Sequence, residues 1–278
     1  MLEFTKMHGA GNDFMVIDAI RQSFTPEPGL IRRLADRHFG VGFDQLLLVE
    51  RPTQPEADFR YRIFNADGSE VQQCGNGARC FVHFVRAHGL TNKTAICVET
   101  ASGLIYPQMA EDGRVSVNMG HPRFRPADIP FVADQEAMEY PVQALDAVWP
   151  LAVLSMGNPH AVLLVDSVEQ APVQALGAAL QCHPRFPEQV NAGFLQCDAP
   201  HQARLRVFER GAGETLSCGT GACAAVVAGI RLGRLVSPVE VDTRGGRLNI
   251  RWDHDSAPVW LTGPTAIVFE GRFDPAAI

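Results

Sequence analysis

Two cysteines in matching glycine-rich segments are the residues of this sequence best suited to chemistry. Cys74 opens the segment Cys-Gly-Asn-Gly-Ala, and Cys218 opens Cys-Gly-Thr-Gly-Ala. A run of apolar residues typical of a helix follows each segment, so each thiol is expected at a helix N-terminus, where unpaired N–H groups and the helix dipole stabilise a thiolate. Two such thiols that face one another could invert a stereocentre. One would remove the α-proton of an amino acid while the other delivers a proton to the opposite face.

The residues that follow each cysteine could stabilise the carbanion formed in such a reaction. Backbone N–H groups around Gly75 and Asn76, and around Gly219 and Thr220, would lie in the first turns of the two helices. Helix N-termini bind anions, and the glycines let the backbone approach a ligand closely. These N–H groups are therefore expected to draw the developing negative charge into the substrate carboxylate.

The remaining cysteines have simpler interpretations. We expect them to be small buried hydrophobic residues, namely Cys80, Cys97, Cys182, Cys197 and Cys223. A zinc site built from Cys74, Cys80, Cys218 and Cys223 is an alternative, but five residues separate Cys74 from Cys80, which is outside the short Cys-x₂₋₄-Cys spacing of such sites. The sequence contains no Cys-x-x-Cys redox motif. Gly-x-Gly without a following Lys-Ser or Lys-Thr is a weak signal for phosphate binding.

The sequence repeats itself once at a nearly constant offset. Cys218 follows Cys74 by 144 residues (218 minus 74). The same or a closely similar offset relates Phe64 to Phe208, Glu70 to Glu214, Gly89 to Gly233, residues 98–100 to 241–243, residues 11–12 to 157–158, and Gln45 to Asn191. This register predicts two copies of one domain, with equivalent residues facing each other across a cleft that holds the active site.

The pattern of apolar residues predicts an α+β fold with two pseudo-symmetric domains. Strands are expected at residues 60–64, 95–100, 104–109, 115–119, 161–165, 203–208, 239–243, 248–252 and 259–262, and helices at 30–38, 78–88, 173–181 and 222–232. The helices at 78–88 and 222–232 are apolar on nearly every face, so each is expected to be buried, with a β-sheet or barrel wrapped around it. The predicted domains are residues 1–120 and 121–264. The proline-rich stretch 123–149 is the expected connection between them.

Composition restricts the class of partner. The 278 residues carry a formal net charge of -7, and the basic residues are scattered, which argues against nucleic acid or an anionic membrane as partner and favours a small molecule. We expect a cytoplasmic protein, because the sequence has no apolar stretch typical of a signal peptide or a membrane span. Only Lys6 and Lys93 are lysines, and neither has a setting typical of a pyridoxal phosphate Schiff base. We therefore expect no cofactor and no metal.

Five segments together resemble the diaminopimelate epimerase family. They are residues 8–14 (His-Gly-Ala-Gly-Asn-Asp-Phe), 65–69 (Asn-Ala-Asp-Gly-Ser), 74–80 (Cys-Gly-Asn-Gly-Ala-Arg-Cys), 157–160 (Gly-Asn-Pro-His) and 209–221, which runs from Glu-Arg-Gly to Ser-Cys-Gly-Thr-Gly. The resemblance covers nearly the whole chain in the expected order. It implies interconversion of LL- and meso-2,6-diaminopimelate on the route to lysine and, in most bacteria, to peptidoglycan, without metal or pyridoxal phosphate.

The resemblance also assigns roles to residues. Cys74 and Cys218 match the paired acid and base of the family, and His160 and Glu209 match the neighbours that tune and orient these thiols. The matching substrate contacts are Asn12, Gln45, Asn65, Gly75, Asn76, Asn158, Asn191, Glu209, Arg210, Gly219 and Thr220. Arg210 and the asparagines would grip the distal carboxylate of a dicarboxylic substrate.

The family further implies a homodimer in which residues 265–278 return to the first domain. Phe269 lies in that segment, at a position where the family often has a tyrosine, and is expected at the subunit interface. Three alternatives remain open. A proline or hydroxyproline racemase would share the fold and the paired thiols, although that group typically has Cys-Gly-His-Gly where this chain has Asn76. The others are a non-catalytic binding module of the same fold and a zinc-stabilised structural protein.

Overall fold

The chain forms two units, each with its own β-sheet and buried helix. A computed structural model describes residues 1–71 and 75–275. One unit comprises Met1–Asn118 with Gly263–Ile278, and the other comprises Met119–Thr262. The chain therefore leaves the first unit once and returns to it near the C-terminus. The boundaries predicted from the sequence lie two residues later, after residues 120 and 264.

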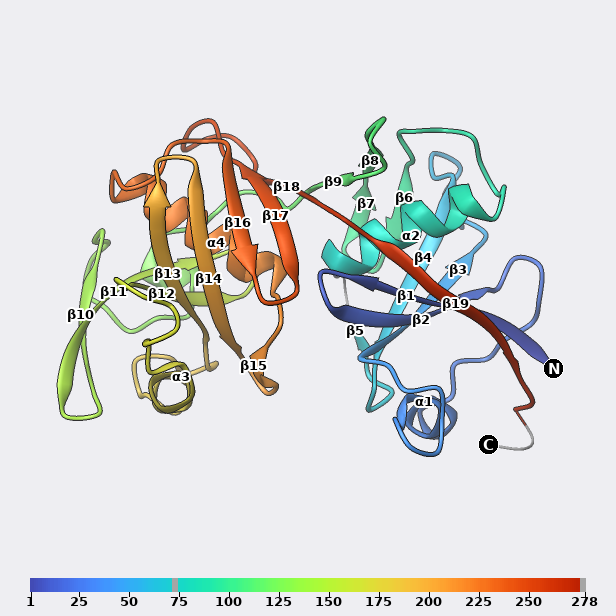
Figure 1. The fold of residues 1–278 in the computed structure, drawn as a ribbon, viewed down its shortest axis with the longest axis horizontal. Coiled ribbons are helices and arrows are strands. Elements are labelled where there is room, and N and C mark those ends of the chain that lie inside the picture. Colours follow the sequence, from blue (N-terminus) through green and yellow to red (C-terminus); the bar gives the residue numbers. More distant parts are fainter. Residues whose placement is uncertain (72–74, 276–278) are drawn as a thin grey trace. The chain divides into compact units, whose positions relative to one another are not determined.

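The first unit is built on a mixed sheet. Its strands pair in the order β19 (Ala266–Phe273), β1 (Leu2–Gly9), β2 (Asn12–Asp18), β3 (Gln45–Glu50), β4 (Phe59–Asn65), β6 (Val98–Thr100) and β7 (Gly103–Ile105), and β5 (Glu70–Val71) pairs with β4. Figure 1 shows β19, in red, which pairs with β1 at one edge of this sheet. The unit also contains α1 (Pro28–Ala35), α2 (Gly75–Ala87) and the paired strands β8 (Gln108–Met109) and β9 (Val115–Asn118).

The second unit has the same construction. Its strands pair in the order β10 (Tyr140–Ala144), β11 (Ala147–Ser155), β12 (Pro159–Leu164), β13 (Asn191–Ala199), β14 (Gln202–Glu209), β16 (Val239–Thr243), β17 (Gly246–Arg251) and β18 (Trp260–Gly263), and β15 (Gly213–Thr215) pairs with β14. Its helices are α3 (Val173–Gln181), α4 (Gly219–Arg231) and the short 3₁₀ helix η1 (Pro126–Asp128).

The pairing of strands confirms the duplication. In the first unit β2 runs parallel to β3 and β4 parallel to β6, and in the second β12 runs parallel to β13 and β14 parallel to β16. The register is also repeated, because Phe14 pairs with Gln45 and His160 pairs with Asn191. In both pairs the second-unit residue follows its first-unit counterpart by 146 residues (160 minus 14, and 191 minus 45). The offset found in the sequence therefore relates equivalent positions in space.

A buried helix fills the core of each unit, as its apolar sequence predicts. α4 packs against β11, β12 and β13, and α2 packs against β1, β2 and β3. Both helices start three residues earlier than expected, at Gly75 and Gly219, so each Gly-x-Gly is the first helical turn and not a preceding loop. The third residue of the second motif, Gly221, leaves room for the thiol, because a Cβ there would lie in tight contact with Cβ of Cys218, at 3.1 Å.

Two expectations about the fold are wrong. The stretch 123–149 does not connect the units but lies within the second one, where η1 is followed by the hairpin of β10 and β11. Pro141 and Pro150 pair with each other at the edge of the sheet, where neither is required to donate a ladder hydrogen bond. The helix expected at 30–38 ends at Ala35, because Asp36 adopts an extended conformation and its carboxylate binds the N–H groups of His38 and Phe39.

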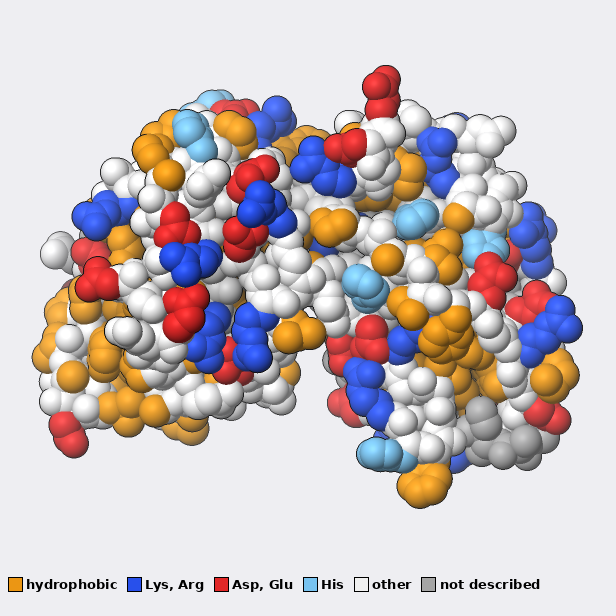
Figure 2. All heavy atoms as spheres, viewed as in Figure 1, with side chains coloured by type: hydrophobic (Ala, Val, Ile, Leu, Met, Phe, Trp, Pro, Cys, Tyr) orange, Lys and Arg blue, Asp and Glu red, His pale blue; other side chains and the backbone are white. Residues whose placement is uncertain are grey.

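The surface of the second unit carries interleaved charges. Arg204 pairs with Asp198 at 2.9 Å, and Arg247 pairs with Asp242 at 2.6 Å. Figure 2 shows basic and acidic side chains alternating over this face of the unit. Within the described part of the chain, no helix has both the length and the apolar composition that a membrane crossing would require.

Candidate active site

Cys218 caps the N-terminus of α4. Its backbone is extended (φ −120°, ψ 118°), and its Sγ accepts a hydrogen bond from the N–H of Gly221 at 3.4 Å. The next N–H, that of Ala222, binds the carbonyl of Cys218. Gly219 and Thr220 occupy the first turn, where N–H groups point out of the helix and have no carbonyl of the helix to bind. The thiol therefore lies at the N-terminus of a helix, as the sequence predicts.

The pKa of Cys218 differs from what the helix start alone would give. Burial raises this pKa well above the usual value of 9.0, and the negative charge and hydrogen bonding of Glu209 raise it further. Hydrogen bonds from Thr220 and from the N–H of Gly221 act in the opposite direction but are outweighed. Desolvation of a thiolate opposes ionisation, so at neutral pH this residue is a protonated thiol. The expected fall in its pKa is wrong for Cys218.

Glu209 is held beside this thiol by the end of β14. Its Oε1 accepts a hydrogen bond from Oγ1 of Thr215 at 2.5 Å, and its carbonyl accepts one from Gln181 at 2.7 Å. Thr215 belongs to β15, which pairs with β14, so the local hairpin fixes the carboxylate. Thr215 was not predicted from the sequence, because its place beside Glu209 depends on the pairing of β14 with β15.

His160 lies on β12 and is almost fully enclosed, with 1% of its surface exposed. Burial, together with the positive charge of Arg210, lowers its pKa from 6.5 to about 3. The imidazole is therefore neutral at physiological pH. Its Nε2 lies 2.9 Å from Oδ1 of Asn158, and Nδ2 of Asn158 donates to Oγ1 of Thr220 at 3.4 Å.

These contacts form a continuous polar chain in the second unit. Thr220 Oγ1 lies 3.5 Å from Sγ of Cys218, so the chain runs from His160 through Asn158 and Thr220 to the thiol. Asn191 is buried beside it, and its Oδ1 accepts the backbone N–H of Arg210 at 2.9 Å. The guanidinium of Arg210 is exposed and donates to the carbonyl of Glu188. All eight predicted residues of this unit therefore lie in the described part of the chain: Asn158, His160, Asn191, Glu209, Arg210, Cys218, Gly219 and Thr220.

The predicted residues of the first unit lie at the corresponding strand ends. Gln45 begins β3 and pairs with Asn65 at the end of β4, and Nε2 of Gln45 donates to Oδ1 of Asn65 at 3.0 Å. Asn12 begins β2 after a tight turn in which Ala10 and Gly11 have positive φ. Asn76 is buried in the first turn of α2, and its Nδ2 donates to Oδ1 of Asn12 at 3.3 Å. Cys74 itself lies outside the described residues.

Several buried polar atoms close to these residues have no partner in the described part of the protein. Oε1 of Gln45 is one, and Oγ of Ser217, the residue before Cys218, is another. A third is Nδ1 of His8, at the start of the first resembling segment. Buried polar groups are almost always hydrogen-bonded, so unpaired ones indicate places where a ligand or water supplies the partner. Ser217 was not predicted, although its position beside Cys218 could have drawn attention to it.

The remaining cysteines only partly match the expected burial. Cys80 and Cys223 are buried, but Cys97 and Cys197 are half-buried and Cys182 is exposed at the end of α3. The interpretation of Cys182 as a buried residue is wrong, because it is the exposed C-cap residue of α3. All six described cysteines are free thiols. Within the two described ranges, no three His, Cys, Asp or Glu side chains are grouped so that they could hold a metal ion.

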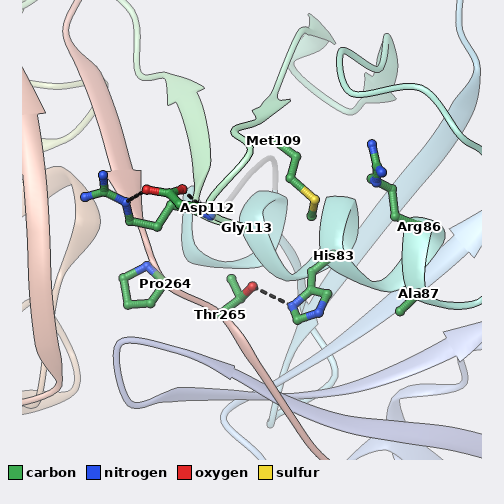
Figure 3. A pocket seen from close by; sticks show the side chains of 9 residues that line it. His83, Arg86, Ala87, Met109, Asp112, Gly113, Pro264 and Thr265 are labelled. Atoms are coloured by element: carbon green, nitrogen blue, oxygen red, sulfur yellow. Dashed lines mark hydrogen bonds and ion pairs between the residues drawn. The ribbon is translucent and has the colours of Figure 1, made fainter.

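A separate cavity of about 500 Å³ lies in the first unit, and none of the predicted residues lines it. Its wall includes His83 and Arg86 of α2 and Thr265, just before β19 (Figure 3). Polar groups at this wall already have partners within the protein. Nδ1 of His83 lies 2.8 Å from Oγ1 of Thr265, and Arg86 donates to the carbonyl of Lys93 at 3.2 Å. The cavity therefore does not define the candidate active site.

The fold defines a class of two-domain proteins that includes epimerases and racemases. A hydroxyproline epimerase from Agrobacterium vitis, 14% identical, covers 97% of this chain and 91% of its own length with a TM-score of 0.67. A probable proline racemase from Agrobacterium radiobacter K84 gives a TM-score of 0.68 at 17% identity, covering all of this chain and 95% of its own. A PhzF-family phenazine biosynthesis protein from Bacillus anthracis gives 0.68 at 18% identity, covering 97% of this chain and 98% of its own.

Sequence comparison identifies the family within this class. The diaminopimelate epimerase family model matches residues 4–125 and 152–268. Diaminopimelate epimerases from Nitrosomonas europaea and from Aromatoleum aromaticum are each 60% identical to this chain over 273 residues, which is 98% of this chain and 99% of each relative. The chain belongs to the diaminopimelate epimerase family. Its resemblance to that family and its expected fold class are thereby confirmed.

Proposed function

We propose that the chain catalyses the interconversion of LL- and meso-2,6-diaminopimelate without metal or pyridoxal phosphate. The observation that carries the proposal is 60% identity to diaminopimelate epimerases over nearly the whole chain. The environment of Cys218, at a helix start beside Glu209, supports it independently. Such a reaction serves the route to lysine, and we place the enzyme in the cytoplasm, where its thiols would stay reduced.

The mechanism needs one acid and one base on opposite faces of the α-carbon. Cys218 rests as a thiol, because burial and Glu209 both oppose its ionisation, so it suits the role of proton donor. Cys74 is proposed as the base in that direction, on the strength of the matching sequence motif. In the reverse direction Cys218 must lose its proton, and the roles of the two thiols exchange.

The neighbouring groups are proposed to orient the reaction. N–H groups of Gly219 and Thr220 at the start of α4 suit a carboxylate of the substrate, with Gly75 and Asn76 supplying the equivalent groups at α2. The neutral imidazole of His160 and the amide of Asn158 form the hydrogen-bonded chain that ends near Cys218. Gln45, Asn65, Asn191 and Arg210 complete the proposed substrate contacts, together with Asn12 and Glu209.

We also propose that the enzyme is a homodimer that uses the edge strand β19. Ile267, Val268 and Phe269 are 36%, 55% and 47% exposed on this edge strand. Exposed apolar residues on a sheet edge are typical of an interaction surface. Phe269 packs edge-on against Phe4 of the same chain, with ring centroids 6.0 Å apart, and this contact restricts the orientation of the Phe269 ring.

Deuterium exchange tests the proposed reaction. Purified protein incubated with LL-diaminopimelate in deuterated water should produce meso-diaminopimelate with deuterium at the inverted α-carbon. Cys74→Ser and Cys218→Ser should each abolish turnover. Cys182→Ser is the matched control, because this exposed thiol lies at the end of α3 and has no proposed role. Exchange into proline but not diaminopimelate would refute the substrate assignment, and full activity in Cys218→Ser would refute the mechanism.

A further inference from the structure

A chain of side-chain hydrogen bonds runs through two of the proposed substrate contacts in the first unit. A guanidinium nitrogen of Arg79 donates to Oδ1 of Asn76 at 2.8 Å. Nδ2 of Asn76 donates to Oδ1 of Asn12 at 3.3 Å. Nδ2 of Asn12 then donates to Oδ2 of Asp44 at 3.0 Å. This series of hydrogen bonds therefore begins at the cation Arg79 and ends at the anion Asp44, with the two amides between them.

The charged ends determine which way each amide points. A guanidinium has only donors, so the atom of Asn76 that faces Arg79 must be its oxygen. A carboxylate has only acceptors, so the atom of Asn12 that faces Asp44 must be its nitrogen. The contact between the two amides is then satisfied as nitrogen to oxygen. Turning either amide by half a rotation would place donor against donor at one side and acceptor against acceptor at the other.

We propose that Asp44 and Arg79 are positioning residues that fix the amide orientations of Asn12 and Asn76 for the substrate. This inference rests on the proposed function, because it takes Asn12 and Asn76 as substrate contacts. Neither charged residue is assigned to the substrate. Each acts through the asparagine that it touches, by deciding whether an oxygen or a nitrogen faces a given direction.

Both charged ends are themselves held in place. The second oxygen of Asp44 accepts from Arg37 at 2.8 Å, and the backbone N–H of Asp44 binds Oδ1 of Asp13 at 2.9 Å. Arg79 has no exposed surface and lies within the buried first half of α2. A buried guanidinium keeps its charge and its fork of donors, so it is a rigid reference for Asn76.

The second unit shows that the orientation is specific to the first. Asn158 occupies the position equivalent to Asn12, and Thr220 that equivalent to Asn76. There the nitrogen of Asn158 faces the helix start, donating to Thr220 at 3.4 Å, and its oxygen faces His160. In the first unit the oxygen of Asn12 faces the helix start. The equivalent amides of Asn12 and Asn158 are thus oriented in opposite ways relative to the helix start. In the first unit, Asp44 is the acceptor that holds the nitrogen of Asn12 away from the helix start.

Asp44→Asn tests the proposal with little risk to folding, because the Asp44 side chain is 47% exposed. The new amide offers one oxygen where the carboxylate offered two. The NH₂ group that the substitution introduces would therefore face the donor of either Asn12 or Arg37, and that hydrogen bond would be lost. We expect kcat/KM for diaminopimelate to fall about 10- to 100-fold, mainly through KM, with an unchanged thermal unfolding midpoint. Asp36→Asn is the matched control, since this carboxylate also binds backbone N–H groups nearby, and it should leave the kinetics unchanged.

Non-additivity separates positioning from a general structural effect. If Asp44 acts through Asn12, then Asp44→Asn should cause no further loss in an Asn12→Ala background. Arg79→Lys, which keeps the charge but loses the fork, should raise KM in the same way. Should that variant fail to fold, the pair Asp44 and Asn12 still decides the matter.

A readout that needs no activity distinguishes this proposal from the proposed function. In ¹⁵N-labelled protein, the side-chain NH₂ resonances of Asn12, assigned by their loss in Asn12→Ala, should shift in Asp44→Asn and not in Asp36→Asn. A wild-type protein without exchange on diaminopimelate would overturn the proposed function, while this NMR result would still decide the orientation. Unchanged resonances, unchanged KM, or additive losses in the double variant would each overturn the positioning role.

Discussion

The buried imidazole of His160 should make the stability of the protein depend on pH in a way that one substitution removes. Its pKa falls from 6.5 to about 3 on folding, chiefly because the charged form would be desolvated. The unfolded chain therefore binds a proton at a higher pH than the folded chain does. This contribution is fully present above pH 6.5 and is lost as the pH falls toward the folded pKa of about 3.

The size of the effect follows from these two values. Between pH 7 and pH 5 the unfolded imidazole becomes almost fully protonated while the folded one stays neutral. Proton linkage then costs about 2 kcal/mol of unfolding free energy over this interval. His160→Gln removes the titrating ring but keeps an N–H that can reach Oδ1 of Asn158. We expect this variant to lose about 2 kcal/mol less than the wild type between pH 7 and pH 5.

Urea unfolding at the two pH values measures the effect. The useful quantity is the change in unfolding free energy between pH 7 and pH 5, compared between variant and wild type, because contributions from all other groups cancel. His254→Gln serves as the control substitution, since this histidine is exposed. An equal loss of stability in His160→Gln and wild type would show that His160 is not held neutral by burial.

Three further predictions concern separate parts of the chain. Glu209→Gln should lower the pKa of Cys218 toward its usual value, because the carboxylate is one cause of the upward shift. A pH titration of the ultraviolet thiolate absorbance would measure this pKa, with Glu209→Gln/Cys218→Ser identifying the part of the signal that comes from Cys218. An unchanged pKa would show that burial alone raises it. Gly177→Ala should lower the free energy of unfolding by about 1 to 3 kcal/mol, because the added Cβ would lie 2.4 Å from the Phe208 ring. Gly29→Ala is the control and should not destabilise the protein, because the atom nearest to its added Cβ lies at 3.8 Å. Urea titration of both variants would measure the two free energies of unfolding. Phe269→Lys should weaken the proposed dimer, since it places a charge in an apolar surface, and sedimentation velocity showing the same species as wild type would contradict this.

The duplication could be predicted from the sequence because both copies kept their turn residues. Glycines and asparagines at strand and helix ends are fixed by backbone conformation, as at Gly11 and Gly157, which both have positive φ. The constant offset then identified pairs such as Gln45 and Asn191 that occupy the same register position. The buried helices were equally accessible, since their sequences are apolar on all sides.

Elements buried on both faces, or placed at an edge, were harder to predict. Leu46, Leu47, Leu48 and Val49 of β3 are all fully buried, so the strand shows none of the alternation that marks a half-exposed strand. The hairpin of β10 and β11 was taken for a connection because of its prolines. Its two prolines are tolerated there only because they pair with each other, which is a property of the register and not of the local sequence.

The site residues could be identified by type and order, but their electrostatics could not. A helix start favours a thiolate, and that single effect suggested a lowered pKa for Cys218. The fold adds nearly complete burial and places Glu209 beside the thiol, and both effects raise the pKa. Asp44 and Arg79 were not predicted because each is defined by a partner that the sequence does not reveal, Asn12 in one case and Asn76 in the other.

The two copies of the domain carry different residues at equivalent positions near the proposed site. The end of β4 carries Asn65 where the end of β14 carries Glu209, and β2 carries Phe14 where β12 carries His160. A neutral amide and a phenyl ring in one copy thus correspond to a carboxylate and an imidazole in the other. Identical copies would give two thiols the same proton affinity, whereas inversion begins with one thiol protonated and one ionised. The proposed mechanism needs this asymmetry, and Glu209, which has no carboxylate counterpart at Asn65, is one of the groups that raise the pKa of Cys218.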